Sequence, residues 1–106
     1  MQFSGENLTR DDMLVRLGDA RGTVGYFMHD HELRGPVASE LKTLHRRLCE
    51  RPATELSWED VAALLNEVVV YVDHLFDIGV PLPRGLGALI HRLMLHQEDD
   101  QRRRPA

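Results

Sequence analysis

The segment between Pro52 and Pro83 constrains the fold most, because it carries the longest apolar repeat of the chain at helical spacing. Its valine-rich centre would suit a strand by propensity, but the helical spacing continues on both sides of that centre. Ser57, followed three residues later by Asp60, predicts where the helix begins, and Gly79 predicts where it ends. The apolar residues that continue the helical repeat are Val61, Leu64, Leu65, Val68, Val72, Leu75 and Phe76.

Two shorter helices are predicted in the N-terminal part of the chain, over residues 9–17 and 19–31. Glycine is a poor residue for a helix interior, so Gly18 is expected to end or loosen the first helix. Asp19 is then in a position to cap the second one.

Two further helices are predicted in the rest of the chain. The first begins at Pro36, a favoured first helical residue, and ends before Pro52. Its apolar stripe is Val37, Leu41, Leu44 and Leu48. The second opens at Pro83 or Arg84 and carries Leu86, Leu89, Ile90, Leu93 and Met94 on one face.

These elements predict an all-α fold, a compact single-domain bundle of about five helices. The chain has 106 residues, which is enough for one core and too few for two. The expected organisation is a flexible N-terminus (1–8), a helical domain (9–97) and a disordered charged tail (98–106). No apolar run approaches the roughly 20 residues that cross a bilayer, and the N-terminus lacks the pattern of a signal peptide. With its single cysteine, the chain is expected to be cytoplasmic, without membrane contact.

The exposed face of the helix between Pro52 and Pro83 is expected to be acidic. This segment holds six acidic residues and no lysine or arginine, in a chain of net charge −4. Such a face can steer a protein towards a basic partner surface, and a merely solvated helix face is the other interpretation of the same pattern. The candidate partner-binding residues are Glu59, Asp60, Asn66, Glu67, Asp73 and Asp77.

Two histidine–carboxylate pairs at a spacing of three residues offer an alternative, a metal site between facing helices. The pairs are His29 with Glu32 and His74 with Asp77. Residues three apart share a helix face, and such ligands suit a transition metal. Solvated polar residues near a helix end are the competing interpretation, so no metal or other cofactor is part of the main prediction.

The chain shows no pattern typical of an enzyme. Cys49 has His45 one turn away on the same helix, but a cysteine beside a leucine stripe is usually a small buried apolar residue. No glycine-rich phosphate loop or nucleophile motif is present. The protein is therefore expected not to be an enzyme.

A basic strip on the predicted 36–51 helix raises the possibility of nucleic-acid binding. The strip consists of Lys42, Arg46, Arg47 and Arg51. The helix lacks the side chains that read base edges, and the whole chain is acidic, so direct nucleic-acid binding is not expected. These bases are expected to pair with acids of the following helix instead.

In size, charge and helicity the chain resembles the anti-CRISPR proteins, small inhibitors encoded by phages and mobile elements. The resemblance rests on general character, so no family residue is carried over to this sequence. It implies a stoichiometric blocker of a CRISPR–Cas component, whose acidic helix docks where nucleic acid normally binds. Antitoxin and immunity proteins share this description. The expected protein is a monomer or weak dimer that binds a basic protein surface.

Overall fold

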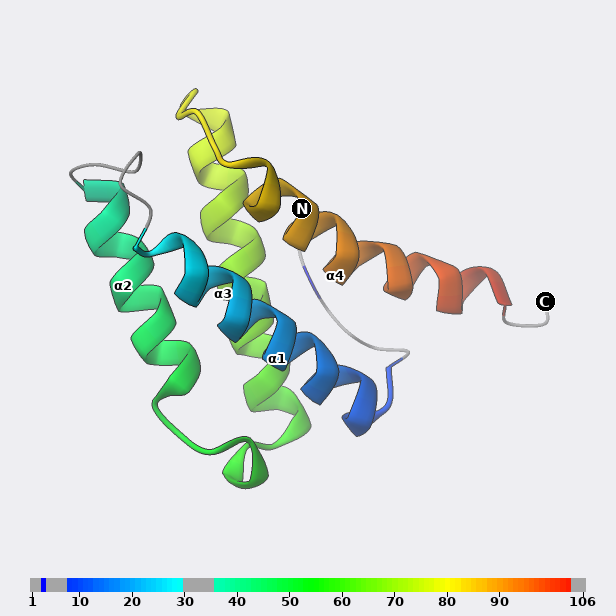
Figure 1. Ribbon diagram of the computed structural model, residues 1–106. Helices are drawn as coiled ribbons and strands as arrows, with labels where there is room; N and C mark the ends of the chain where they lie inside the picture. Colours follow the sequence, from blue (N-terminus) through cyan, green and yellow to red (C-terminus); the bar gives the residue numbers. More distant parts are fainter. Residues whose placement is uncertain (1–2, 4–7, 30–35, 104–106) are drawn as a thin grey trace.

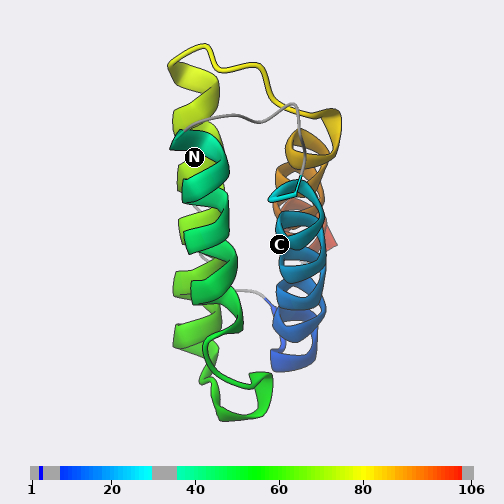
Figure 2. The same cartoon turned by 60° about the vertical axis from the view of Figure 1, so that its left-hand side comes forward.

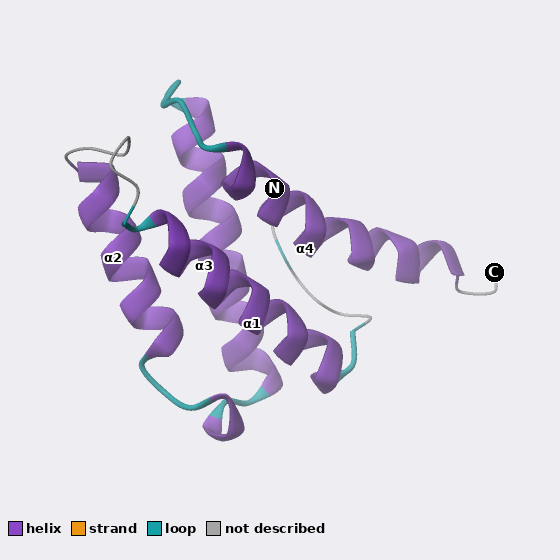
Figure 3. Ribbon diagram, in the orientation of Figure 1, coloured by secondary structure: helices purple, strands orange, loops and turns teal. Residues whose placement is uncertain are grey.

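The computed structural model describes residues 3, 8–29 and 36–103, with the backbone alone described for 95–103. The described residues form four α-helices: α1 (Arg10–Phe27), α2 (Pro36–Cys49), α3 (Trp58–Asp77) and α4 (Arg84–Arg103). A single 3₁₀ turn, η1 (Ala53–Glu55), lies between α2 and α3, and none of these residues forms a strand (Figure 3). The all-α prediction is confirmed, with four helices in place of about five.

The helix count differs because α1 continues through Gly18. The helix buries one unbroken face, formed by Met13, Arg16, Leu17, Ala20 and Val24. Packing of that face outweighs the roughly 1 kcal/mol that a glycine costs in a helix interior. Asp19 caps no second helix. Its two carboxylate oxygens each accept a hydrogen bond at 2.9 Å from the guanidinium of Arg92 on α4.

The predicted boundaries of α3 are confirmed. Ser57 and Asp60 form a capping box, in which each side chain accepts a hydrogen bond from the other residue's backbone N–H. At the other end, Gly79 has a φ of 77°, a left-handed conformation that glycine adopts without steric cost. α4 extends to Arg103, so its backbone is helical beyond Glu98, where the predicted tail begins.

The four helices pack as two antiparallel pairs. Figure 2 shows α2 and α3 on one side and α1 and α4 on the other, and Figure 1 shows α1 crossing in front of α2 and α3. α1 contacts each of the other three helices, whereas α2 and α3 contact each other less than either contacts α1. Arg21 of α1 ties α1 to the end of α2, since it donates hydrogen bonds to the carbonyls of Leu48 (2.7 Å) and Arg51 (2.9 Å).

The core lies between the two pairs and includes part of the N-terminal segment. The side chains of Phe3 and Leu8 are buried in it. The Phe3 backbone N–H donates a hydrogen bond to Asn66 Oδ1 (2.9 Å), and the Trp58 indole N–H donates to the Leu8 carbonyl (3.3 Å). Phe3 and Leu8 are therefore both attached to α3.

Candidate functional site

The acids predicted to share one face of α3 are divided among three environments. Asp60 and Glu67 face the side of α2: Arg51, just after the end of α2, lies 3.6 Å from Asp60 Oδ2, and Arg47 of α2 lies 2.5 Å from Glu67 Oε1. For Arg47 and Arg51, this pairing confirms the expectation that the bases of the predicted 36–51 helix pair with acids of the next helix. It also corrects the view of an acidic face without cations, because the cations come from the neighbouring segment of the chain.

The remaining candidate residues do not form one surface either. The Asn66 side chain accepts a hydrogen bond from the backbone N–H of Phe3, and Asp73 is half-buried. Glu59 and Asp77 are exposed, but they lie at opposite ends of α3. α3 therefore does not present a continuous acidic strip.

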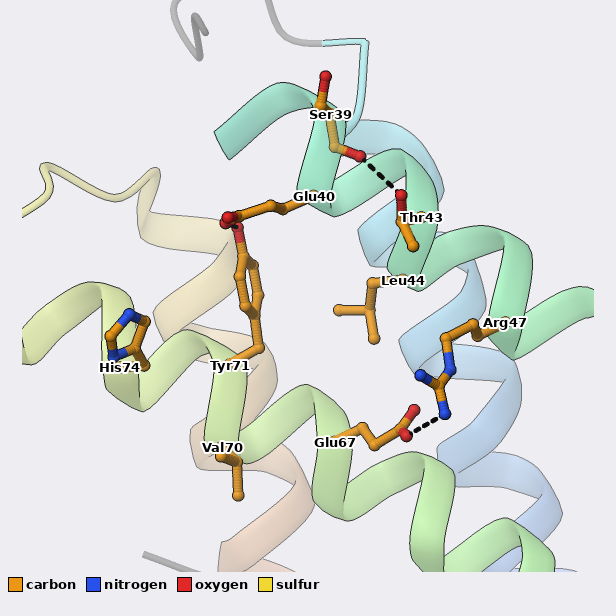
Figure 4. A pocket seen from close by; sticks show the side chains of 9 residues that line it. All are labelled: Ser39, Glu40, Thr43, Leu44, Arg47, Glu67, Val70, Tyr71 and His74. Carbon is orange, nitrogen blue, oxygen red and sulfur yellow. Dashed lines mark hydrogen bonds and ion pairs between the residues drawn. The ribbon is translucent and has the colours of Figure 1, made fainter. Parts of the chain in front are cut away.

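A groove between α2 and α3 has a volume of about 590 Å³. Its α2 wall carries Ser39, Glu40, Thr43, Leu44 and Arg47, and its α3 wall carries Glu67, Val70, Tyr71 and His74. In Figure 4 the Tyr71 ring reaches from α3 towards Glu40, and Leu44 points into the space between the helices. Val70 lies on the α3 wall with 46% of its surface exposed. The groove therefore has an apolar floor between polar rims.

A second, smaller hollow of about 220 Å³ continues along the same helix pair. Arg47 and Glu67 line both hollows. Their ion pair, drawn as a dashed line in Figure 4, crosses the seam between α2 and α3. The other residues of the smaller hollow are Leu48, Glu50, Arg51, Leu56, Asp60, Ala63 and Leu64.

The rims of the two hollows carry excess negative charge. Four carboxylates line them, against two guanidinium groups that already pair with Glu67 and Asp60. Glu40 and Glu50 pair with no cation in the part of the chain that the structure describes. Burial raises the pKa of the Tyr71 phenol, and its hydrogen bond to Glu40 Oε2 (2.6 Å) adds to this effect. The tyrosine therefore stays neutral and leaves the charge of Glu40 in place.

One oxygen of Glu67 has no partner. Oε1 accepts the hydrogen bond from Arg47, whereas Oε2 is buried and accepts no hydrogen bond from any described residue. A buried carboxylate oxygen without a donor is energetically unfavourable. This atom therefore marks the point of the seam with the greatest need for a donor.

The predicted metal ligands are not brought together as a complete set. His29 is exposed near the end of α1, Asp77 is exposed at the end of α3, and His74 lines the groove. Glu32 lies outside the described residues. Within residues 3, 8–29 and 36–103 there is no group of three or more histidine, cysteine or acidic side chains arranged to hold a metal.

The cysteine departs from the sequence-based interpretation. Cys49 is exposed at the last residue of α2, with its Sγ 3.6 Å from His45 Nε2. Lys42 and Arg46 are exposed on α2.

Of the groove residues, the sequence singles out Glu67 and His74, whereas Glu40 and Val70 could not be recognised from it as site residues. The available signal was their spacing: Glu40, Thr43 and Arg47 follow one edge of α2, and Glu67, Tyr71 and His74 follow one edge of α3. Which edges would face each other could not be read from either helix alone.

No helix in the described ranges has both the length and the apolar character that crossing a membrane requires. Comparisons with protein families, curated proteins and solved structures found no match to this chain.

Proposed function

We propose that this protein is a non-enzymatic binding protein that docks a basic segment of a partner protein in the groove between α2 and α3. The observation that carries the proposal is the groove itself, an open apolar floor between rims with unbalanced carboxylates. Apolar anchors that enter pockets supply most of the affinity of a protein interface, and complementary charge supplies orientation and a fast association rate.

The proposal moves the binding surface from the outer face of α3 to the seam with α2. Exposed acids such as Glu59 and Asp77 lie outside the groove and contribute long-range attraction only. Val70 and Tyr71 supply the contact area that a charged strip lacks. The metal alternative receives no support from the described residues and is not proposed.

The partner that we expect is a bacterial protein whose basic surface handles nucleic acid, a CRISPR–Cas component being the example that the resemblance suggests. Inhibition would follow from occupying that surface. Titrating the protein into a reconstituted CRISPR–Cas cleavage reaction tests this finer proposal, with a groove variant as control.

The groove is tested most directly by Val70→Lys, with Val15→Lys as the matched control. Both valines are exposed on helices, Val70 inside the groove and Val15 on the outer face of α1. The probe is a fluorescent 18-residue amphipathic helix, with leucines on one side and arginines on the other, measured by anisotropy. We expect wild type and Val15→Lys to bind it, with affinity that falls as salt rises. Val70→Lys should lose at least tenfold in affinity, and equal binding by all three proteins would refute the proposal.

A further inference from the structure

We infer that the two hollows form one channel, and that the docked segment carries an arginine that replaces Arg47 on Glu67. The inference rests on the proposed function and adds the chemistry of the ligand's central contact. When the ligand binds, its arginine occupies the position beside Glu67 that Arg47 holds in the free protein.

The larger and the smaller hollow lie on the same seam, and Arg47 and Glu67 are the two residues that line both. The helices that form the seam contact each other less than either contacts α1. A segment long enough to occupy both hollows must therefore cross the Arg47–Glu67 pair.

The Arg47–Glu67 ion pair opens at little energetic cost. The side chain of Arg47 is 57% exposed and that of Glu67 is 35% exposed. Ion pairs in contact with water contribute little to stability, because solvent screens the attraction and ordering two long side chains costs entropy. Arg47 can therefore swing into solvent without unfolding α2.

The group that replaces Arg47 on Glu67 is a guanidinium. Arg47 donates to Oε1 of Glu67 alone, and the buried Oε2 has no donor among the described residues. A guanidinium that approaches along the channel can donate to both oxygens at once, in the paired geometry that arginine and carboxylates favour. An incoming arginine thus satisfies an atom that receives no hydrogen bond from the described residues.

The charges around the channel favour the same occupant. The four carboxylates along the rims exceed the two guanidiniums, so a cation gains attraction at every point of entry. Leu44, Val70 and Tyr71 lie on the side of the larger hollow and suit an apolar residue about one helical turn from the arginine. The partner segment is therefore an amphipathic helix with a central arginine beside an apolar anchor.

The experiment compares two peptides that differ at one atom. The first is a second fluorescent 18-residue amphipathic helix, which has leucines on one side and a single central arginine on the other; the second carries citrulline there, which is nearly isosteric but neutral. Affinities are measured by anisotropy for wild type, Arg47→Ala, Glu67→Gln and the control Arg46→Ala. Arg46 is an exposed neighbour of Arg47 that lines neither hollow. Thermal melts of all four proteins establish that they are folded.

We expect wild type to prefer arginine over citrulline about tenfold or more, as for a hydrogen bond to a charged group. Arg47→Ala should bind the arginine peptide several-fold more tightly, because no competitor remains on Glu67. Glu67→Gln should lose most of the preference between the two peptides, and Arg46→Ala should behave as wild type.

If citrulline binds as well as arginine, or if Arg47→Ala binds no more tightly than wild type, the inference is overturned while docking in the groove stands. If neither peptide binds wild type, or if Val70→Lys binds as wild type does, the proposed function fails as well.

Discussion

Replacing Gly18 with alanine should stabilise the protein, although the sequence around it suggests the end of a helix. Gly18 lies in the interior of α1 on its exposed side, and a Cβ added there meets no atom within 4 Å. Alanine is favoured over glycine in a helix interior by roughly 0.8–1 kcal/mol, partly because it restricts the unfolded chain. Gly22 is in the same situation, so substituting both should add roughly 1.5–2 kcal/mol to the free energy of unfolding.

Two other glycines serve as matched controls. A Cβ on Gly25 of the same helix would lie 2.9 Å from His45 Nε2, so the imidazole must shift and part of the gain is lost. Gly79 has a φ of 77°, and alanine there should destabilise the protein by about 1–2 kcal/mol. The expected order of stability therefore has Gly18→Ala and Gly22→Ala above wild type and Gly79→Ala below it.

Urea denaturation followed by circular dichroism measures these differences, and a thermal melt provides a second estimate. For a domain of this size, the double variant should melt roughly 6–16 °C higher than wild type. A loss of stability in Gly18→Ala, together with a gain in Gly22→Ala, would refute the reasoning. That result would mean that α1 is interrupted at residue 18, as the sequence alone suggests.

Three other predictions concern the core and two polar contacts. Leu65→Ala should lower the free energy of unfolding by about 2–5 kcal/mol, because the side chain is fully buried; a loss below about 1 kcal/mol in a urea titration would contradict that burial. Asp19→Asn should cost up to about 1 kcal/mol at neutral pH, since the carboxylate is partly exposed. The hydrogen bonds from Arg92 lower the pKa of Asp19, so this contribution is present above the ordinary carboxyl pKa near ~3.9 and is lost as pH falls through the lower folded value. Urea titrations at several pH values should show the stabilities of wild type and Asp19→Asn converging in acid, and a constant difference would argue against the pair. Tyr71→Phe should cost about 1 kcal/mol near neutral pH through loss of the hydrogen bond to Glu40. Because the pKa of Tyr71 is raised, that contribution is present below about pH 10 and is lost as pH rises through the folded value; a gap that stays constant in alkaline urea titrations would contradict this.

The parts of the fold that follow from local chemistry could be predicted from the sequence. The capping box at Ser57 and Asp60, the left-handed Gly79 and the leucine stripe of α2 each depend on residues within a few positions of one another. The continuity of α1 could not be predicted in this way. It depends on burial against three other helices, which outweighs the local cost of Gly18.

The candidate site was less predictable, because its contacts join distant positions. Arg47 and Glu67 are 20 residues apart, Glu40 and Tyr71 are 31 apart, and Phe3 is 63 residues from Asn66. Periodicity places each of these residues on an edge of its own helix. It does not say which edge the next helix meets, and so it could not distinguish an exposed acid from one that faces an arginine.

The central position of α1 has a consequence for how the protein opens. α2 and α3 have little contact with each other, so their association depends on α1, which packs against both. When α1 detaches, the buried leucines of α2 become hydrated at the same moment as those of α1. Slowly exchanging amides of α1 and α2 should therefore share one protection free energy and exchange deuterium as a single cooperative unit.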